Sequence, residues 1–294
     1  ALIIADTPEI ARHAVGLMKI DVDPWDAIVD PRVAHAKGQF IAPPREFVMG
    51  DVESEWAKCD VVVEGTCDIA GQEHLYLETQ RSRAIPTEGH KIQIYASTQS
   101  PFAVQKAAAN IIGVPNHMVE VDVKRLGGGF GGKEDQATAW SCLACLGAFL
   151  LDKPVELVLN RVDDLQMTGK RHPYAADFKI GLSADGKILA YEAKLFQNSG
   201  AVADLSTAVL ERSLFHATNA YFIPNTRVYA APCRTNLHPH TAFRGFGGPQ
   251  SMFVIEAAIS KAAEKMGVPR EEIQFQNLLR ENDSFPYGQI AEGC

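Results

Sequence analysis

The glycine-rich run from Gly127 to Glu134 limits what this chain can fold into more than any other feature. It reads GGGFGGKE and stands between two segments of regular pattern. Before it, Val119, Val121 and Val123 alternate with polar residues, which predicts a half-buried strand. After it, a long apolar stretch with acidic residues at its start predicts a buried helix. The sequence therefore predicts the order strand, glycine turn, helix.

Such a turn is typical of anion binding, because glycines permit positive φ and let amide groups approach a ligand at a helix N-terminus. Two generic patterns fit: Gly127-x-Gly129-x-x-Gly132 for dinucleotides, and Gly127-x4-Gly132-Lys133 for a P-loop. Glu134 replaces the hydroxyl that a P-loop needs, and no acidic residue ends the following segment VELVLN. A nucleotide-binding module and a turn that only redirects the chain remain alternatives.

A second glycine turn, RGFGG from Arg244 to Gly248, also precedes a helical pattern. Arg244 adds a planar guanidinium suited to phosphate or carboxylate. Two such turns indicate one large anionic ligand held from two sides. Phe130 and Phe246 are unusual in flexible turns, because a large ring is favourable there only if it packs on something. A flat aromatic substrate is a candidate partner for one of them.

The rest of the chain mixes strand and helix patterns. The Asp185-Gly186 pair predicts a hairpin turn between two strands. Strands are predicted within residues 59–70, 81–89, 91–98, 177–183, 187–196 and 225–235, and helices within 100–113, 251–267 and 269–280. Residues 8–23 predict a short helix that leads into a strand. Because the spacing is not that of regular βαβ units, the predicted fold class is α+β.

Residues 25–47 lose periodicity and gather prolines, so we expect a domain boundary near residue 40. The chain starts inside a helix-like pattern without an initiator Met or a polar tail. We therefore expect a fragment or subunit of a longer protein.

Charge and hydropathy exclude two classes of partner. The net charge is −8, with Lys and Arg spread along the chain, which argues against nucleic acid. No stretch reaches the roughly 18 apolar residues of a membrane span, and the start lacks a basic leader. An acidic cytoplasmic protein is expected.

The cysteines indicate reduced thiols, because they are too few and too scattered for a disulfide framework. They are Cys59, Cys67, Cys142, Cys145, Cys233 and Cys294. The C-x-x-C pair of Cys142 and Cys145 lies inside an apolar run and is expected to pack in the core. No C-x4-C-x2-C spacing is present, so no iron–sulfur cluster is expected on this chain.

Five segments, in order and over nearly the whole chain, resemble the xanthine dehydrogenase and aldehyde oxidase family. They are GQEHLYLET (71–79), STQ (97–99), RLGGGFGGKE (125–134), ERSLFHATNAY (211–221) and TAFRGFGGPQ (241–250). The resemblance implies that residues 1–40 form the end of an α/β hammerhead domain and a linker. It implies that residues 41–294 form the first molybdenum-cofactor domain.

The resemblance also implies which residues bind the molybdenum pyranopterin, or molybdopterin, cofactor. The Gln of STQ, the Phe and Gly of GGGFGG and the Arg of TAFRGFGG correspond here to Gln99, Phe130, Gly131 and Arg244. In the family the metal is held by the dithiolene of the pterin, so no side chain is expected to ligate it.

Glu134 and Arg212 correspond to the family's purine-binding pair, and Phe246 to the ring that stacks on the substrate. A carboxylate and a guanidinium can orient a purine through its rim, and Arg212 can stabilise negative charge that develops on the ring. Glu134 and Arg212 are therefore the catalytic residues expected in this chain. Two plainer alternatives are that Glu134 only opposes a helix dipole and that Arg212 and Glu211 form a solvated pair.

The resemblance implies oxidative hydroxylation of purines, from hypoxanthine to xanthine to urate. Aldehyde oxidases carry less polar residues at the positions of Glu134 and Arg212, so a hydroxylase of aldehydes or other N-heterocycles is the alternative. The family's catalytic glutamate lies in a second molybdenum domain, and the terminal IAEGC does not resemble its motif, so Glu292 is not expected to be that base. This chain alone is expected to be inactive.

Other partners follow from the same resemblance. It places 2Fe–2S clusters, FAD and NAD on other domains or subunits and implies a higher oligomer. Four histidines are expected to have structural roles: His238 and His240 in a loop, and His74 and His216 in the core.

Besides the molybdenum hydroxylase and the nucleotide-binding module, a third hypothesis is a scaffold domain that keeps the turns and binds nothing.

Overall fold

The computed structural model describes residues 2–293 and contains two compact units. The first unit comprises Ala1–Ala27 and His74–Gly169, and the second comprises Ile28–Glu73 and Lys170–Cys294. Each unit has its own sheet and its own hydrophobic core. This mixture of largely antiparallel sheets with packed helices confirms the predicted α+β class. The boundary near residue 40 stays a prediction.

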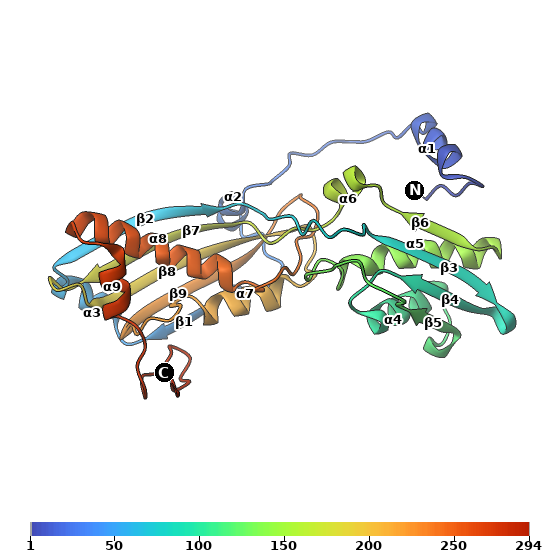
Figure 1. The fold of residues 1–294 in the computed structure, drawn as a ribbon. Coiled ribbons are helices and arrows are strands. Elements are labelled where there is room, and N and C mark those ends of the chain that lie inside the picture. Colours follow the sequence, from blue (N-terminus) through green and yellow to red (C-terminus); the bar gives the residue numbers. More distant parts are fainter. Residues whose placement is uncertain (1, 294) are drawn as a thin grey trace. The chain divides into compact units, whose positions relative to one another are not determined.

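The first unit is built on a four-stranded sheet of order β5-β4-β3-β6 (Figure 1). Its strands are β3 (Arg81–Thr87), β4 (Lys91–Ala96), β5 (Val119–Asp122) and β6 (Val155–Val158). Only β4 and β5 are parallel. The helices α4 (Pro101–Ile112) and α5 (Gln136–Leu151) share the hydrophobic core with this sheet. The remaining segments are α1 (Pro8–Leu17), α6 (Arg161–Met167), η2 (Glu88–His90) and η3 (Asn116–Met118).

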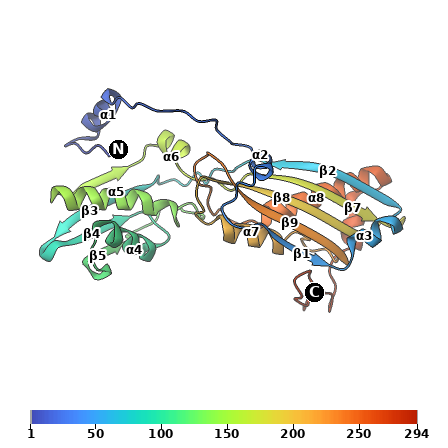
Figure 2. The same cartoon turned by 180° about the vertical axis from the view of Figure 1, so that it is seen from behind.

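The second unit is built on a five-stranded sheet of order β1-β9-β8-β7-β2. Its strands are β1 (Arg45–Met49), β2 (Val61–Ile69), β7 (Tyr174–Leu182), β8 (Ile188–Gly200) and β9 (Asn225–Arg234). The helices α7 (Ser206–Phe215), α8 (Gly248–Met266) and α9 (Arg270–Gln276) contribute to its main core. Seen from behind, the strands lie in front of α8 (Figure 2). The short segments are α2 (Pro31–Ala36), α3 (Val52–Glu55) and η1 (Trp56–Lys58).

Several boundaries lie where the sequence predicts them. The hairpin between β7 and β8 turns at Asp185-Gly186, where Gly186 has φ +89°. Gly113 ends α4 and Gly267 ends α8, both in the left-handed conformation that favours glycine. Cys142 and Cys145 are buried in the core of the first unit, as predicted, whereas Cys294 lies outside the described residues.

Three local predictions were wrong. The strand expected after α1 does not form, because the residues following Met18 are exposed coil without a pairing partner strand. Helix α5 begins only at Gln136, so its first turn carries no acidic residue. The helix α7 was not predicted at all; it begins without a side-chain cap. The position of α7 matters because it carries Arg212.

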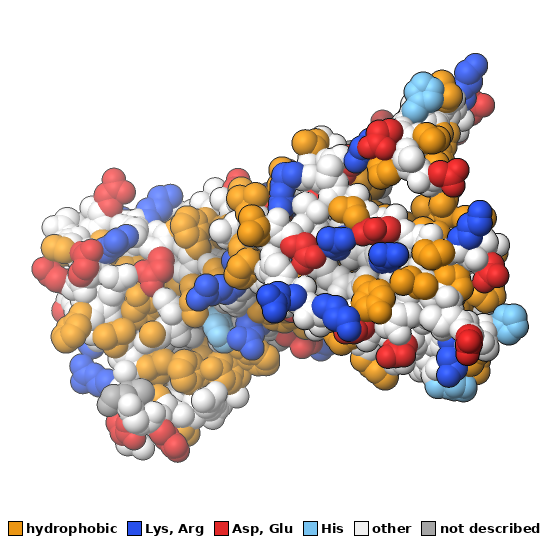
Figure 3. Space-filling view, turned by 45° about the vertical axis from the view of Figure 1, so that its right-hand side comes forward, with side chains coloured by type: hydrophobic (Ala, Val, Ile, Leu, Met, Phe, Trp, Pro, Cys, Tyr) orange, Lys and Arg blue, Asp and Glu red, His pale blue; other side chains and the backbone are white. Residues whose placement is uncertain are grey.

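The surface in view in Figure 3 mixes acidic, basic and hydrophobic side chains. Within residues 2–293, none of the helices combines the length and apolar character needed to cross a membrane.

Candidate functional site

The two glycine turns have similar φ angles at their central residues, although they belong to different units. In the first, Gly132 N donates to Gly129 O at 2.8 Å, and in the second, Gly248 N donates to Gly245 O at 3.1 Å. Both residues between these ends have positive φ in each turn: +56° and +101° for Phe130 and Gly131, and +50° and +101° for Phe246 and Gly247. Positive φ at both central positions defines a type I′ turn.

A phenylalanine at positive φ is a backbone outlier, because its Cβ crowds the main chain in the left-handed region. Such a residue costs about 1–3 kcal/mol and persists only where its surroundings fix it, often at a functional site. The same strain therefore occurs at the corresponding position of both turns, at Phe130 and Phe246. Phe130 is 50% exposed, so packing within the described residues covers it only in part.

Four amides of the first turn are already bonded within the unit, which limits how many the turn can offer to a phosphate. Gly127 N donates to Glu78 Oε2 at 2.9 Å. Gly131 N and Lys133 N donate to Gln99 Oε1 at 2.9 and 3.2 Å. With Gly132 N bonded to Gly129 O, four amides of the run are unavailable to a ligand. The phosphate cradle stays a prediction, with fewer backbone N–H groups to supply it.

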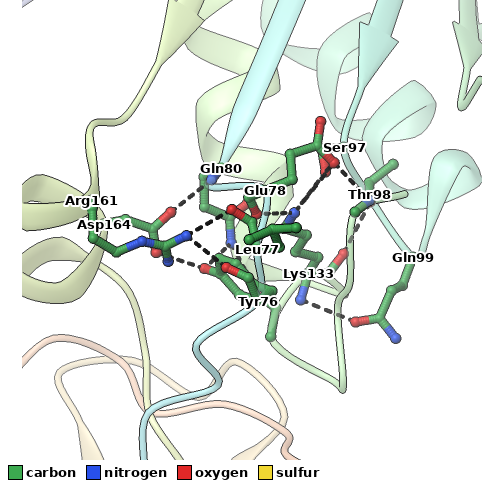
Figure 4. Close-up of polar contacts among 12 residues, drawn as sticks. Tyr76, Leu77, Glu78, Gln80, Ser97, Thr98, Gln99, Lys133, Arg161 and Asp164 are labelled. Atoms are coloured by element: carbon green, nitrogen blue, oxygen red, sulfur yellow. Dashed lines mark hydrogen bonds and ion pairs between the residues drawn. The ribbon is translucent and has the colours of Figure 1, made fainter. Parts of the chain in front are cut away.

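Gln99 follows the end of β4 and is exposed. Its side-chain oxygen accepts the two amide bonds just described, and this fixes which end of the amide is which, because a nitrogen there would face two donors. The side-chain nitrogen therefore points away from the turn, as Figure 4 shows. Glycine at 129 leaves room for this arrangement, because a Cβ there would lie 2.5 Å from Gln99 Oε1.

Beneath the turn lies a buried ammonium group, that of Lys133, whose side chain is 0% exposed (Figure 4). Its Nζ donates to Glu78 O and to Ser97 Oγ, each at 2.7 Å, and lies 4.4 Å from the ring centroid of Tyr76. Burial lowers the pKa of Lys133. Burial raises the pKa of Glu78, but the bonds from Gly127 and Ser97 and the charge of Lys133 outweigh it, so this pKa lies below its usual value.

A second layer of buried polar groups supports the same turn. Asp164, at 0% exposure, accepts from Tyr76 Oη at 2.8 Å and from Gln80 N at 2.7 Å. Gln80 Nε2 donates to Gly132 O at 2.9 Å. The turn is therefore tied to the segment 76–80 and, through Asp164, to α6.

The second turn is held differently, by hydroxyl groups and by close packing. Ser213 Oγ donates to Gly247 O at 3.0 Å and shares a hydrogen bond with Tyr174 Oη at 2.9 Å. A Cβ on Gly247 would lie 2.2 Å from Val209 O, so the backbone of α7 touches this turn directly. Helix α8 starts at once, at Gly248.

The predicted site residues divide between the units. Gln99, Phe130, Gly131 and Glu134 lie in the first unit, and Arg212, Arg244 and Phe246 in the second. Nothing within one unit joins all seven, so the complete site stays a prediction.

Within the second unit, the guanidinium carbon of Arg212 lies 6.0 Å from the ring centroid of Phe246. Glu211 pairs with Arg45 at 3.4 Å, which disfavours the alternative of a solvated Arg212–Glu211 pair. Arg244 is exposed in the second turn. Neither Arg212 nor Arg244 forms a salt bridge within residues 2–293. Both cations are therefore open to an anionic or acceptor ligand.

Three histidines cluster near the second turn. The rings of His238 and His240 lie 4.9 Å apart, and those of His172 and His240 lie 6.0 Å apart. Burial lowers the pKa of His240 to about 3, and it lowers the pKa of His238 and His172 as well. No three His, Cys, Asp or Glu side chains in the described part of the chain are grouped so that they could hold a metal ion.

Known proteins are similar to this chain in sequence and in fold. The chain matches the molybdopterin cofactor-binding domain family over residues 34–278. It is 40% identical over 292 residues to xanthine dehydrogenase/oxidase of Mus musculus, covering 99% of this chain and 22% of that protein. It is 39% identical over 297 residues to xanthine dehydrogenase of Oryza sativa subsp. japonica, covering 100% of this chain and 22% of that protein.

Solved structures agree with this match. Aldehyde oxidoreductase from Desulfovibrio gigas superposes with a TM-score of 0.88 at 28% identity, covering 98% of this chain and 32% of that chain. The chain thus spans only 22% of the length of the xanthine dehydrogenases from Mus musculus and Oryza sativa. Because the family match covers most of its residues, the chain belongs to the molybdopterin cofactor-binding domain family, the type of domain found in molybdenum hydroxylases.

Proposed function

We propose that this chain forms cofactor and substrate walls of an enzyme that hydroxylates purines oxidatively, from hypoxanthine to xanthine to urate. The observation that carries the proposal is Arg212: an exposed guanidinium beside the ring of Phe246, with no carboxylate partner among residues 2–293. An aromatic ring next to an open cation suits a flat heterocycle with acceptor atoms on its rim.

The chemistry of the donor set fits the molybdenum pyranopterin cofactor. Gln99 presents side-chain N–H groups outward, and Arg244 presents an exposed guanidinium. Both are donors, as a ligand with a phosphate and several acceptor atoms requires. We propose that Gln99, Phe130, Gly131 and Arg244 bind this cofactor.

The substrate contacts are assigned by chemistry. Glu134, half-exposed directly after the first turn, is proposed to accept a hydrogen bond from a ring N–H of the purine. Arg212 is proposed to donate to a purine carbonyl and to stabilise the negative charge that builds up there during the reaction. Phe246 is proposed to pack against the ring face. The similarity to xanthine dehydrogenases supports this substrate class.

When bound, the cofactor would supply the redox chemistry of the hydroxylation. The chain's own residues bind and orient the purine and stabilise charge on it. We propose that the glutamate base, the 2Fe–2S clusters, FAD and NAD belong to other parts of a larger, oligomeric cytoplasmic enzyme. The described chain alone is then inactive.

The test is a charge-deletion series in the full-length enzyme. Arg212→Met and Glu134→Val should each lower kcat/KM for xanthine by about 100-fold or more, as loss of a charged transition-state contact does. Lys187→Met serves as a matched control, because its Nζ bonds only Gln276 O at the far hairpin. Unchanged xanthine turnover in both site variants, at full molybdenum content, would exclude the purine assignment.

A hydroxylase of aldehydes is the second candidate, favoured by the similarity to Desulfovibrio gigas aldehyde oxidoreductase. The two candidate substrates differ in whether the charges of Arg212 and Glu134 contribute to turnover. If an aldehyde is the substrate, Arg212→Met and Glu134→Val should change its turnover by no more than about threefold. An aldehyde lacks the polar ring atoms of a purine that Arg212 and Glu134 would bind.

A further inference from the structure

We propose that the buried ammonium group of Lys133 positions the side-chain amide of Gln99, so that this amide presents N–H donors, and not its oxygen, to the cofactor. This inference rests on the proposed contact between Gln99 and the cofactor, but not on the identity of the substrate. Lys133 is thus a positioning residue that acts through Gln99.

The main chain of Lys133 forms hydrogen bonds with both the backbone and the side chain of Gln99. Lys133 O accepts from Gln99 N at 2.7 Å and from Thr98 Oγ1 at 3.1 Å. Lys133 N donates to Gln99 Oε1 at 3.2 Å. A displacement of residue 133 therefore changes both the backbone and the side chain of Gln99.

The side chain of Lys133 prevents that displacement. Its Nζ is bonded to Glu78 O and Ser97 Oγ, and Glu78 Oε2 lies 3.7 Å away (Figure 4). Ser97 directly follows β4, so the ammonium joins the exit of the turn to the sheet. An ammonium at 0% exposure cannot leave these partners without becoming a buried unpaired charge.

The orientation of the Gln99 amide follows from these bonds. Its oxygen already accepts hydrogen bonds from two backbone donors, Gly131 N and Lys133 N. Only the nitrogen is left to meet a ligand, so the ligand atom there has to be an acceptor. If residue 133 is released, one of the two donors is lost and the amide can rotate its oxygen outward, where it would repel an acceptor.

The first readout needs no cofactor. Hydrogen–deuterium exchange of peptides covering residues 127–135 is measured by mass spectrometry in the full-length protein produced without cofactor synthesis. Lys133→Met should speed exchange of this turn about tenfold, because the bond from Gly131 N to Gln99 loosens. Lys187→Met, the matched control from the second unit, should leave this exchange unchanged.

The second readout is retention of molybdenum, measured as metal per chain during gel filtration after mild heating. Lys133→Met and Gln99→Ala should each release molybdenum about tenfold faster than the parent, and the double variant should be no faster than either. Because neither readout uses turnover, both stand if xanthine is not the substrate. Failure of the purine proposal therefore appears separately, in the kinetics of the parent enzyme.

Ser97→Ala covers the case in which Lys133→Met does not accumulate. It removes one acceptor of Nζ and should produce the same changes, about threefold in size. Unchanged exchange and retention in a folded Lys133→Met or Ser97→Ala protein would overturn the inference. Effects that multiply in the double variant would overturn it too, because they would show that Lys133 acts independently of Gln99.

Discussion

The two glycine turns share the φ angles of their central residues but are stabilised by different means. The turn at Phe130 is held by side chains and buried charges: Gln99, Glu78 and Lys133. The turn at Phe246 is held by the hydroxyl of Ser213 and by direct contact with the α7 backbone. The same strained geometry can therefore be imposed by electrostatics in one unit and by packing in the other. This difference predicts that different substitutions destabilise the two turns.

The largest expected effect comes from adding a methyl group where backbone supports the turn. Gly247→Ala places a Cβ 2.2 Å from Val209 O at φ +101°, and should lower the free energy of unfolding by at least about 3 kcal/mol. Gly129→Ala meets only the side chain of Gln99 and should cost less. Urea unfolding of both variants measures the difference.

Gly113→Ala is the control for this pair. It has φ +73° with no atom within 4 Å of the added Cβ, so it reports the cost of positive φ alone, about 1 kcal/mol. If Gly247→Ala cost no more than Gly113→Ala, contact with α7 would not be what supports the second turn.

The next effect separates buried charge from hydroxyl groups. Asp164→Ala leaves Tyr76 Oη and Gln80 N without their acceptor in the interior, and should cost about 3 kcal/mol. Ser213→Ala removes a neutral hydrogen bond beneath the second turn and should cost about 1 kcal/mol. Denaturant midpoints at constant slope give both values. Equal costs would erase the distinction between the two kinds of support.

Acid should act on the second unit through its buried histidines. The pKa of His240 is lowered to about 3 by burial, whereas an unfolded histidine titrates near 6.5. The unfolded chain therefore binds a proton first, so the stability present above pH 6.5 is lost as pH falls towards 3, by about 1.4 kcal/mol per pH unit for each such histidine.

The measurement is the free energy of unfolding between pH 6 and pH 4, compared in the parent and in His240→Phe. The variant should lose less stability per pH unit, because one neutral imidazole no longer has to stay unprotonated. Both ring nitrogens of His240 lack a hydrogen-bond partner among the described residues, so the substitution breaks no hydrogen bond there. An identical pH slope in the two proteins would exclude His240 as a source of acid sensitivity.

The smallest expected effect concerns the strain itself. Phe130→Gly relieves a positive φ at a ring that is 50% exposed, and should change stability by no more than about 1 kcal/mol, in the stabilising direction. Phe246→Gly should gain less, because its ring is partly buried and lies beside Arg212. A thermal melt of each variant decides; a large loss in Phe130→Gly would mean that its ring packs on something essential.

Much of the fold around the first turn could be predicted, because its signals are local. Alternating valines mark β5, and glycines mark the ends of α4 and α8. The bonds that fix the turn could not, because Glu78 and Gln99 reach it across 49 and 32 residues of sequence. Helix α7, which carries Arg212, was missed because its N-cap residue, Leu205, has no capping side chain.

The bonded amides of the first turn have a practical consequence for handling the protein. Inorganic phosphate or sulfate normally binds to rows of free backbone N–H groups. Here four of these groups already donate to acceptors inside the unit: those of Gly127, Gly131, Gly132 and Lys133. Such ions therefore find four fewer donors at this position. We therefore expect phosphate buffers and sulfate precipitants to bind at the first turn more weakly than at a turn whose amides are all free.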